Sequence, residues 1–267
     1  MATSSNAAAA EIAAFKKVQK ALNKSHAFAE PAGFDAGFPD FGFRVMVGGK
    51  KVDLHIEYKA DAKAQMGSMR DWVFDGTKFM TPTPANEEKS DLIDIMNTAP
   101  EAIKNAKRLL SDLKKFADPK INMIYSGTMT IEKDKEKRRE KLVNFAKETS
   151  SYQIAKISNT TLGAAVITHY KKKFKKSRKS DADASALLMM IGNKVWLVDK
   201  TPSFNAGVEK EIATYFGATK IPSIGPISAA LEVRIQPRGL SAPGKPVSID
   251  VMASFRLSST ISGGMDV

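Results

Sequence analysis

The sequence contains no cysteine among its 267 residues. Disulfide bonds and thiolate metal sites are therefore excluded, and their absence fits a reducing compartment. No apolar run approaches the roughly 20 residues that a membrane-spanning helix needs. The first residues, MATSSNAAAAEIAAF, lack the basic segment and strongly apolar core of a secretory signal. We therefore expect a cytoplasmic protein with no membrane segment.

Several catalytic motifs are absent as well. The sequence has no zinc-finger spacing, no GxxxxGK[ST] loop for nucleotide phosphates and no G-x-S-x-G turn for a nucleophilic serine. ATPase and serine-hydrolase activities therefore have no support.

Basic residues exceed acidic ones, with 41 Lys and Arg against 29 Asp and Glu and a formal net charge of +12. Such a balance favours a polyanionic partner, and nucleic acid before a membrane surface. The densest basic cluster, interleaved with Tyr170 and Phe174, comprises Lys171, Lys172, Lys173, Lys175, Lys176, Arg178 and Lys179. We expect this basic cluster to contact DNA phosphates, which gives affinity rather than sequence choice. A solvated charge run is the alternative.

The pattern of apolar residues predicts one α/β domain over residues 1–267, with a mixed β-sheet flanked by helices. Its core covers about residues 6–80 plus later strands, and an elaborated C-terminal half covers about 150–267. A connecting turn or helix is expected after Lys59. The other predicted helices lie at about 6–22, 90–96, 98–116, 132–148 and 208–216, and the later strands at 121–131, 186–191, 194–198, 230–236 and 247–257.

The most informative stretch is a predicted hairpin, in which two apolar strands are joined by Gly48-Gly49. These glycines suit the positive φ angles of a two-residue turn, which places Val47 opposite Lys50. This register gives an apolar face of Phe41, Phe43, Val45, Val52, Leu54 and Ile56. Because side chains alternate along a strand, the other face carries Asp40, Gly42, Arg44, Asp53, His55, Glu57 and Lys59.

On that second face Asp40 lies opposite Glu57, and Lys59 follows. Like charges directly opposite each other are destabilising unless a cation intervenes, and hard divalent ions take carboxylate ligands. A metal held there can polarise a phosphate and activate water, which makes phosphodiester hydrolysis plausible chemistry. The alternative is the exposed polar edge of a sheet. We expect Asp53 to form an ion pair with Arg44, and His55 to be a surface or supporting residue.

Pro39-Asp40, followed after sixteen residues by Glu57-Tyr58-Lys59, resembles the signature of the PD-(D/E)XK nuclease superfamily, which has the restriction-endonuclease-like fold. The resemblance covers about residues 11–75. It implies a Mg²⁺ ion, replaceable by Mn²⁺, held by Asp40, Glu57 and the carbonyl of Tyr58, with Lys59 near the attacking water. It further suggests a carboxylate from the preceding helix, Glu11 with Glu30 in reserve, and a glutamine, Gln65.

The sequence therefore predicts a divalent-metal-dependent DNA endonuclease. A homodimer is expected, because cutting two strands normally requires two active sites. Restriction-type, homing and junction-resolving roles all stay open. The alternative is a basic DNA-binding or structural protein without catalysis.

Overall fold

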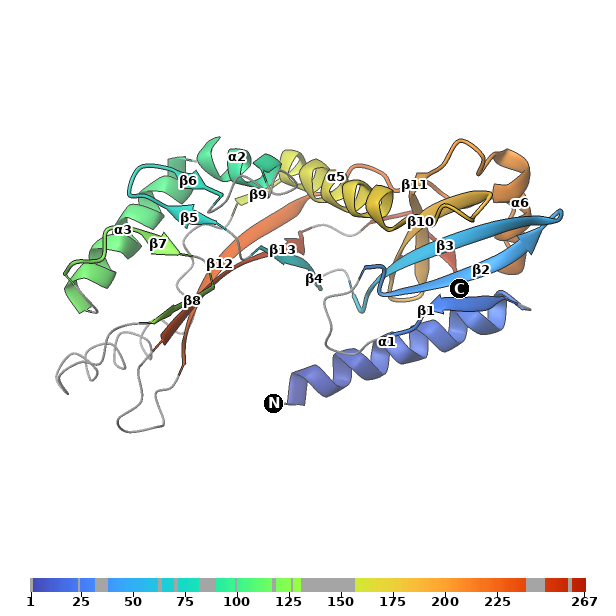
Figure 1. Cartoon of the computed structure of the whole chain (residues 1–267), viewed down its shortest axis with the longest axis horizontal. Helices are drawn as coiled ribbons and strands as arrows, with labels where there is room; N and C mark the ends of the chain where they lie inside the picture. The colour runs from blue at the N-terminus through green and yellow to red at the C-terminus, as the bar shows by residue number, and fades with distance from the viewer. Residues whose placement is uncertain are drawn as a thin grey trace. The chain divides into compact units, whose positions relative to one another are not determined.

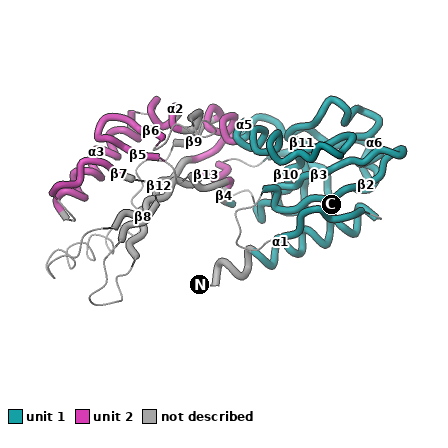
Figure 2. The backbone as a smooth tube through the Cα atoms, viewed as in Figure 1, with its two compact units in different colours: residues 1–64, 167–227, 259–267 teal, residues 65–166, 228–258 magenta. Residues whose placement is uncertain are grey.

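The structure is a computed structural model that describes residues 2–23, 25–31, 38–61, 64–69, 72–81, 90–98, 100–116, 119–125, 127–130, 157–238, 248–258 and 261–267. The helix predicted at 132–148 lies outside these residues. The chain divides into two compact units (Figure 2). The first contains residues 1–64, 167–227 and 259–267, and the second contains 65–166 and 228–258. That both units belong to a single nuclease-like domain stays a prediction.

The first unit is built on a six-stranded mixed sheet, which confirms the predicted α/β class. β3 runs parallel to β10, and the other neighbouring strands are antiparallel. In spatial order the strands are β1 (His26–Ala29), β2 (Phe41–Val47), β3 (Lys50–Lys59), β10 (Ala184–Ile191), β11 (Lys194–Lys200) and β14 (Met265–Asp266).

The hairpin of β2 and β3 has the register that the sequence predicts, from Val47 opposite Lys50 to Phe41 opposite Ile56. Gly48 and Gly49 have φ angles of 56° and 81°, the left-handed values that such a turn requires. The second predicted hairpin is also confirmed, since Ile191 pairs with Lys194 across a two-residue turn.

Helices cover both faces of this sheet. α1 (Ala2–Ala21) and α6 (Ala206–Tyr215) bury apolar side chains against the apolar face of the hairpin and the neighbouring strands. The C-terminal part of α5 (Thr160–Ser177) covers the other face, and Figure 1 shows α1 and α5 on opposite sides of the sheet. None of the described helices is long and apolar enough to cross a membrane.

The second unit contains a five-stranded antiparallel sheet, formed by β4 (Gln65–Met69), β8 (Gly127–Thr130), β9 (Ile157–Asn159), β12 (Ala229–Arg238) and β13 (Ser248–Leu257). β12 and β13 confirm the two strands predicted near the C-terminus. The prediction of a turn or helix after Lys59 is wrong for residues 65–69, which form the strand β4. Residues 65–69 instead pair with β13, a partner nearly 200 residues later in the chain that local sequence does not reveal.

A smaller sheet in the same unit consists of β5 (Val73–Phe74), β6 (Phe79–Met80) and β7 (Ile124–Tyr125). α2 (Ser90–Thr98) is attached to it by Asn97, whose side chain accepts a hydrogen bond from Phe79 N and donates one to Phe79 O. α3 (Pro100–Phe116) follows α2 and confirms the helix predicted to end near Phe116. The aromatic rings of Trp72, Phe74 and Phe79 form the centre of this small core.

A candidate active site on the first hairpin

The structure brings together three of the predicted site residues in a carboxylate–lysine cluster of Asp40, Glu57 and Lys59. Lys59 Nζ lies 2.6 Å from Glu57 Oε1 and 3.8 Å from Asp40 Oδ2. Glu57 and Lys59 are two residues apart on β3 and therefore project to the same face. Asp40 directly precedes β2, where its Oδ2 accepts a 2.7 Å hydrogen bond from the backbone N of Tyr58.

The cluster is electrostatically strained. Burial raises the pKa of the Asp40 carboxyl to about 7, and repulsion from Glu57 adds to this shift, although Lys59 and the Tyr58 N–H oppose it. Burial alone would lower the pKa of Lys59, but the Glu57 and Asp40 carboxylates reverse this effect and raise it. Lys59 is therefore protonated at neutral pH. Two carboxylates share this one ammonium, which leaves negative charge that a further cation would stabilise.

Glu11 is the third carboxylate within electrostatic range of the cluster. It lies half-buried on α1, and burial raises its pKa, with Lys59 opposing and Glu57 reinforcing the shift. Glu30, the reserve candidate, is exposed just after β1. Gln65 belongs to β4 in the second unit, and its side chain is outside the described residues.

Tyr170 is a contact that the sequence analysis did not assign to the site. It is buried on α5 and donates a hydrogen bond to Glu57. Burial, then the charges of Glu57 and Asp40, raise the pKa of the Tyr170 hydroxyl well above its usual value, so it remains a donor. A sequence signal did exist, because Leu162, Val166, Tyr170 and Phe174 recur every four residues and are all buried.

α5 also covers His55, which is fully buried and therefore not a surface histidine. Its ring lies 5.1 Å from that of Phe28 and 5.2 Å from that of Phe174, measured between centroids. Burial lowers the pKa of His55 to about 4. The negative charge of Asp53 raises this pKa, whereas the positive charges of Lys179 and Arg178 lower it further. The exposed-edge alternative is wrong, because β3 lies inside the sheet and α5 covers Glu57 and His55 on this face.

The predicted ion pair between Arg44 and Asp53 is confirmed. Arg44 Nε and Nη2 donate hydrogen bonds of 2.6 and 2.8 Å to the two carboxylate oxygens of Asp53. The same guanidinium also donates to both oxygens of Asp181, in the segment between α5 and β10. Asp53 is thereby fully engaged in a structural contact and is not available as a metal ligand.

The basic cluster occupies the last two turns of α5 and the residues after it. Lys171, Lys172 and Lys173 are half-buried, whereas Lys175, Lys176, Arg178 and Lys179 are exposed. Some of these cations lie against aromatic rings: Lys173 Nζ is 5.6 Å from the ring centroid of Phe38, and Lys179 Nζ is 4.9 Å from that of Phe28. Helix α5 thus buries Tyr170 beside Glu57 and, a few residues later, exposes the positively charged side chains of Lys175 and Lys176.

The donor set of the cluster suits a hard divalent ion. Among the described residues, no three His, Cys, Asp or Glu side chains are grouped so that they alone could hold a metal. Mg²⁺, however, is usually held by one or two carboxylates and completes its shell with water and substrate phosphate oxygens. Asp40 and Glu57 supply two such carboxylates, and the excess negative charge between them favours a cation.

We compared the chain with protein-family models, with curated proteins and with solved structures. None of them matches. Function must therefore be inferred from the chemistry of the cluster itself.

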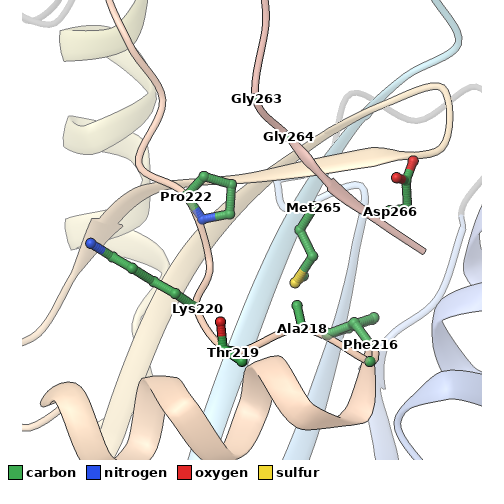
Figure 3. Close-up of a pocket in the computed structure, with 10 residues that line it drawn as sticks. Phe216, Ala218, Thr219, Lys220, Pro222, Gly263, Gly264, Met265 and Asp266 are labelled. Carbon is green, nitrogen blue, oxygen red and sulfur yellow. The ribbon is translucent and has the colours of Figure 1, made fainter.

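A separate, open pocket of about 560 Å³ lies between the turn after α6 and the C-terminal strand β14 (Figure 3). Its lining residues are Phe216, Gly217, Ala218, Thr219, Lys220, Pro222, Gly263, Gly264, Met265 and Asp266. Apart from Lys220 and Asp266 these residues are not ionisable, and none belongs to the carboxylate–lysine cluster. The pocket therefore adds nothing to the candidate active site.

Proposed function

We propose that this protein is a divalent-metal-dependent endonuclease that hydrolyses phosphodiester bonds in DNA. The observation that carries the proposal is the convergence of Asp40, Glu57 and Lys59, with the ammonium 2.6 Å from one carboxylate and 3.8 Å from the other. A mixed sheet with helices on both faces is also what the PD-(D/E)XK resemblance implies. Membership of that superfamily is part of the proposal.

In this proposal the carboxylates of the cluster hold the metal ion, and Lys59 acts on the attacking water and the phosphate. A Mg²⁺ or Mn²⁺ ion held by Asp40, Glu57 and the carbonyl of Tyr58 would polarise the phosphate and lower the pKa of a water molecule. Lys59 is protonated at neutral pH and so cannot accept a proton from that water. It instead orients the water and stabilises negative charge that develops on the phosphate. Glu11 would contribute additional negative charge from α1.

DNA is the substrate that the overall charge favours. A net charge of +12 attracts a polyanion, and the exposed part of the basic cluster follows Tyr170 in the last turn of α5 and the residues just after it. Cleavage of both strands would require two copies of the site, so we propose a homodimer as the working form.

The direct test is cleavage of supercoiled, linear, single-stranded and four-way-junction DNA in Mg²⁺. We expect the wild-type protein to cut at least one of these substrates and Glu57→Gln to lose cleavage while it retains DNA binding. Glu211→Gln is the matched control, because this carboxylate is exposed on α6. Full DNA cleavage by Glu57→Gln would contradict the proposal. Binding without cleavage by the wild type, together with no metal uptake in calorimetry, would instead support the non-catalytic DNA-binding alternative.

A further inference from the structure

Helix α3 in the second unit has a strongly one-sided charge distribution. Its buried face consists of Ala102, Ala106, Leu109, Leu110 and Leu113. The opposite, exposed face carries what we call the α3 basic stripe: Lys104, Lys107, Arg108, Lys114 and Lys115. At 3.6 residues per turn these five residues fall within an arc of about 120°, and they extend over about 16 Å of helix. The stripe is therefore one continuous surface.

The stripe contains no described acidic side chain that is exposed. Asp112 is half-buried at its edge, and Arg108, Asp112 and Lys115 each have an interaction partner within the protein. A helix face that is merely solvated usually mixes charges of both signs, because like charges three or four residues apart destabilise a helix. The helix dipole favours lysines in the last turn, such as Lys114, but does not explain Lys104 and Lys107.

We propose that the α3 basic stripe binds the phosphate backbone of duplex DNA, as a contact surface separate from the basic cluster on α5. This inference rests on the proposed function for the identity of the ligand. Lysine and arginine side chains spaced along a rigid helix can each neutralise a phosphate and release its counterions. A membrane-surface helix would need large apolar side chains beside its charges, and the described exposed residues of α3 are Pro100, Ser111 and the five basic residues alone.

The small core of the second unit gives the stripe a fixed orientation. Leu109 and Leu113 are fully buried. Leu110 lies close to Gly76, since a Cβ atom built on this glycine would be 3.5 Å from Leu110 Cδ2. The preceding helix α2 is held by the paired hydrogen bonds between Asn97 and Phe79. Because the helix is held rigidly, little backbone conformational entropy is lost when its lysines meet a ligand.

The test is binding of a fluorescent duplex of about 20 base pairs, followed by anisotropy in EDTA between about 50 and 200 mM salt. The stripe variant combines Lys104→Gln, Lys107→Gln and Lys114→Gln. We expect its affinity to fall at least tenfold and the slope of log K against log salt to become shallower by about two to three units.

Two matched variants control for charge and for folding. A variant with Lys50→Gln, Lys210→Gln and Lys220→Gln removes the same charge from exposed positions elsewhere, and it should bind nearly as the wild type does. Arginine at the three stripe positions should restore binding. An unchanged salt slope in the stripe variant would overturn the inference, as would a loss of binding to anionic lipid vesicles without a loss of binding to DNA.

Lysine-reactive labelling of the wild-type protein gives a second measurement that does not depend on the folding of any variant. Lys104, Lys107 and Lys114 should be protected when duplex DNA is added, and their full labelling in a saturated complex would refute the inference. All these measurements are made without metal and are therefore independent of cleavage. A protein that binds DNA through α3 but never cuts it would contradict the proposed function alone, and a protein that cuts DNA without using α3 would contradict this inference alone.

Discussion

The metal-free protein should become more stable when Asp40 is replaced by asparagine. Burial and the nearby Glu57 carboxylate raise the pKa of Asp40 from 3.8 to about 7. The folded protein therefore keeps a proton that the unfolded chain has lost, and the contribution of Asp40 to stability falls as pH rises from about 4 to about 7. A shift of about three units corresponds to at most about 4 kcal/mol. Asparagine can still accept the hydrogen bond from Tyr58 N.

The net gain will be smaller than this limit, because Asp40→Asn also removes a favourable charge for Lys59. We expect the free energy of unfolding at pH 8 to increase by about 1–3 kcal/mol, and by about a third of that at pH 5. The assay is urea unfolding in EDTA at both pH values. A Trp72→Phe background leaves Trp196, which is buried on β11 of the first unit, as the fluorescent reporter.

The controls make this prediction refutable. Asp266→Asn, at an exposed carboxylate near the C-terminus, should change the stability by less than about 0.5 kcal/mol at either pH. Mg²⁺ should stabilise the wild type by mass action but not Asp40→Asn. If Asp40→Asn were no more stable than the wild type at pH 8, or if its gain did not grow with pH, the strained cluster would not exist as described.

Three further predictions concern the residues around the cluster. Tyr170→Phe removes a hydrogen bond to a buried carboxylate, so cleavage should slow about tenfold in single-turnover assays; an unchanged rate would contradict a role for this contact. Gly42→Ala should lower the free energy of unfolding by about 1–3 kcal/mol in urea, because the added Cβ would collide with the ring of Phe28. Gly225→Ala is the control and should leave the stability nearly unchanged, because there is open space around this residue. Because the pKa of His55 is lowered to about 4, the contribution of His55 to stability should fall by about 3 kcal/mol as pH falls from 6.5 to 4, opposite in sign to the contribution of Asp40. Urea unfolding across that range should therefore show the stability of His55→Leu relative to the wild type rising by about this amount as pH falls; a constant difference would contradict the assignment.

The part of the site that the sequence predicts is the part that depends on local rules. Two glycines define the turn, and the two-residue period of a strand then puts Asp40, Glu57 and Lys59 on one face. Tyr170 could not be found in this way, because its contact with Glu57 depends on how α5 packs on the sheet. The burial of His55 was missed for the same reason. A strand pattern reveals which residues share a face but not what covers that face.

The second unit interrupts the first one in the chain, and this connectivity has a consequence for the order in which the protein folds. β3 carries Glu57, but its parallel partner β10 is synthesised only after residues 65–166 and α5. Contacts between such distant segments form slowly, and an unfinished chain exposes apolar surface until they form. A nascent chain that ends before residue 160 would thus carry all three residues of the cluster without α5 and β10, which pack on this part of β3. The proposed active site could therefore form only after β10 has been synthesised, and shorter chains would lack it.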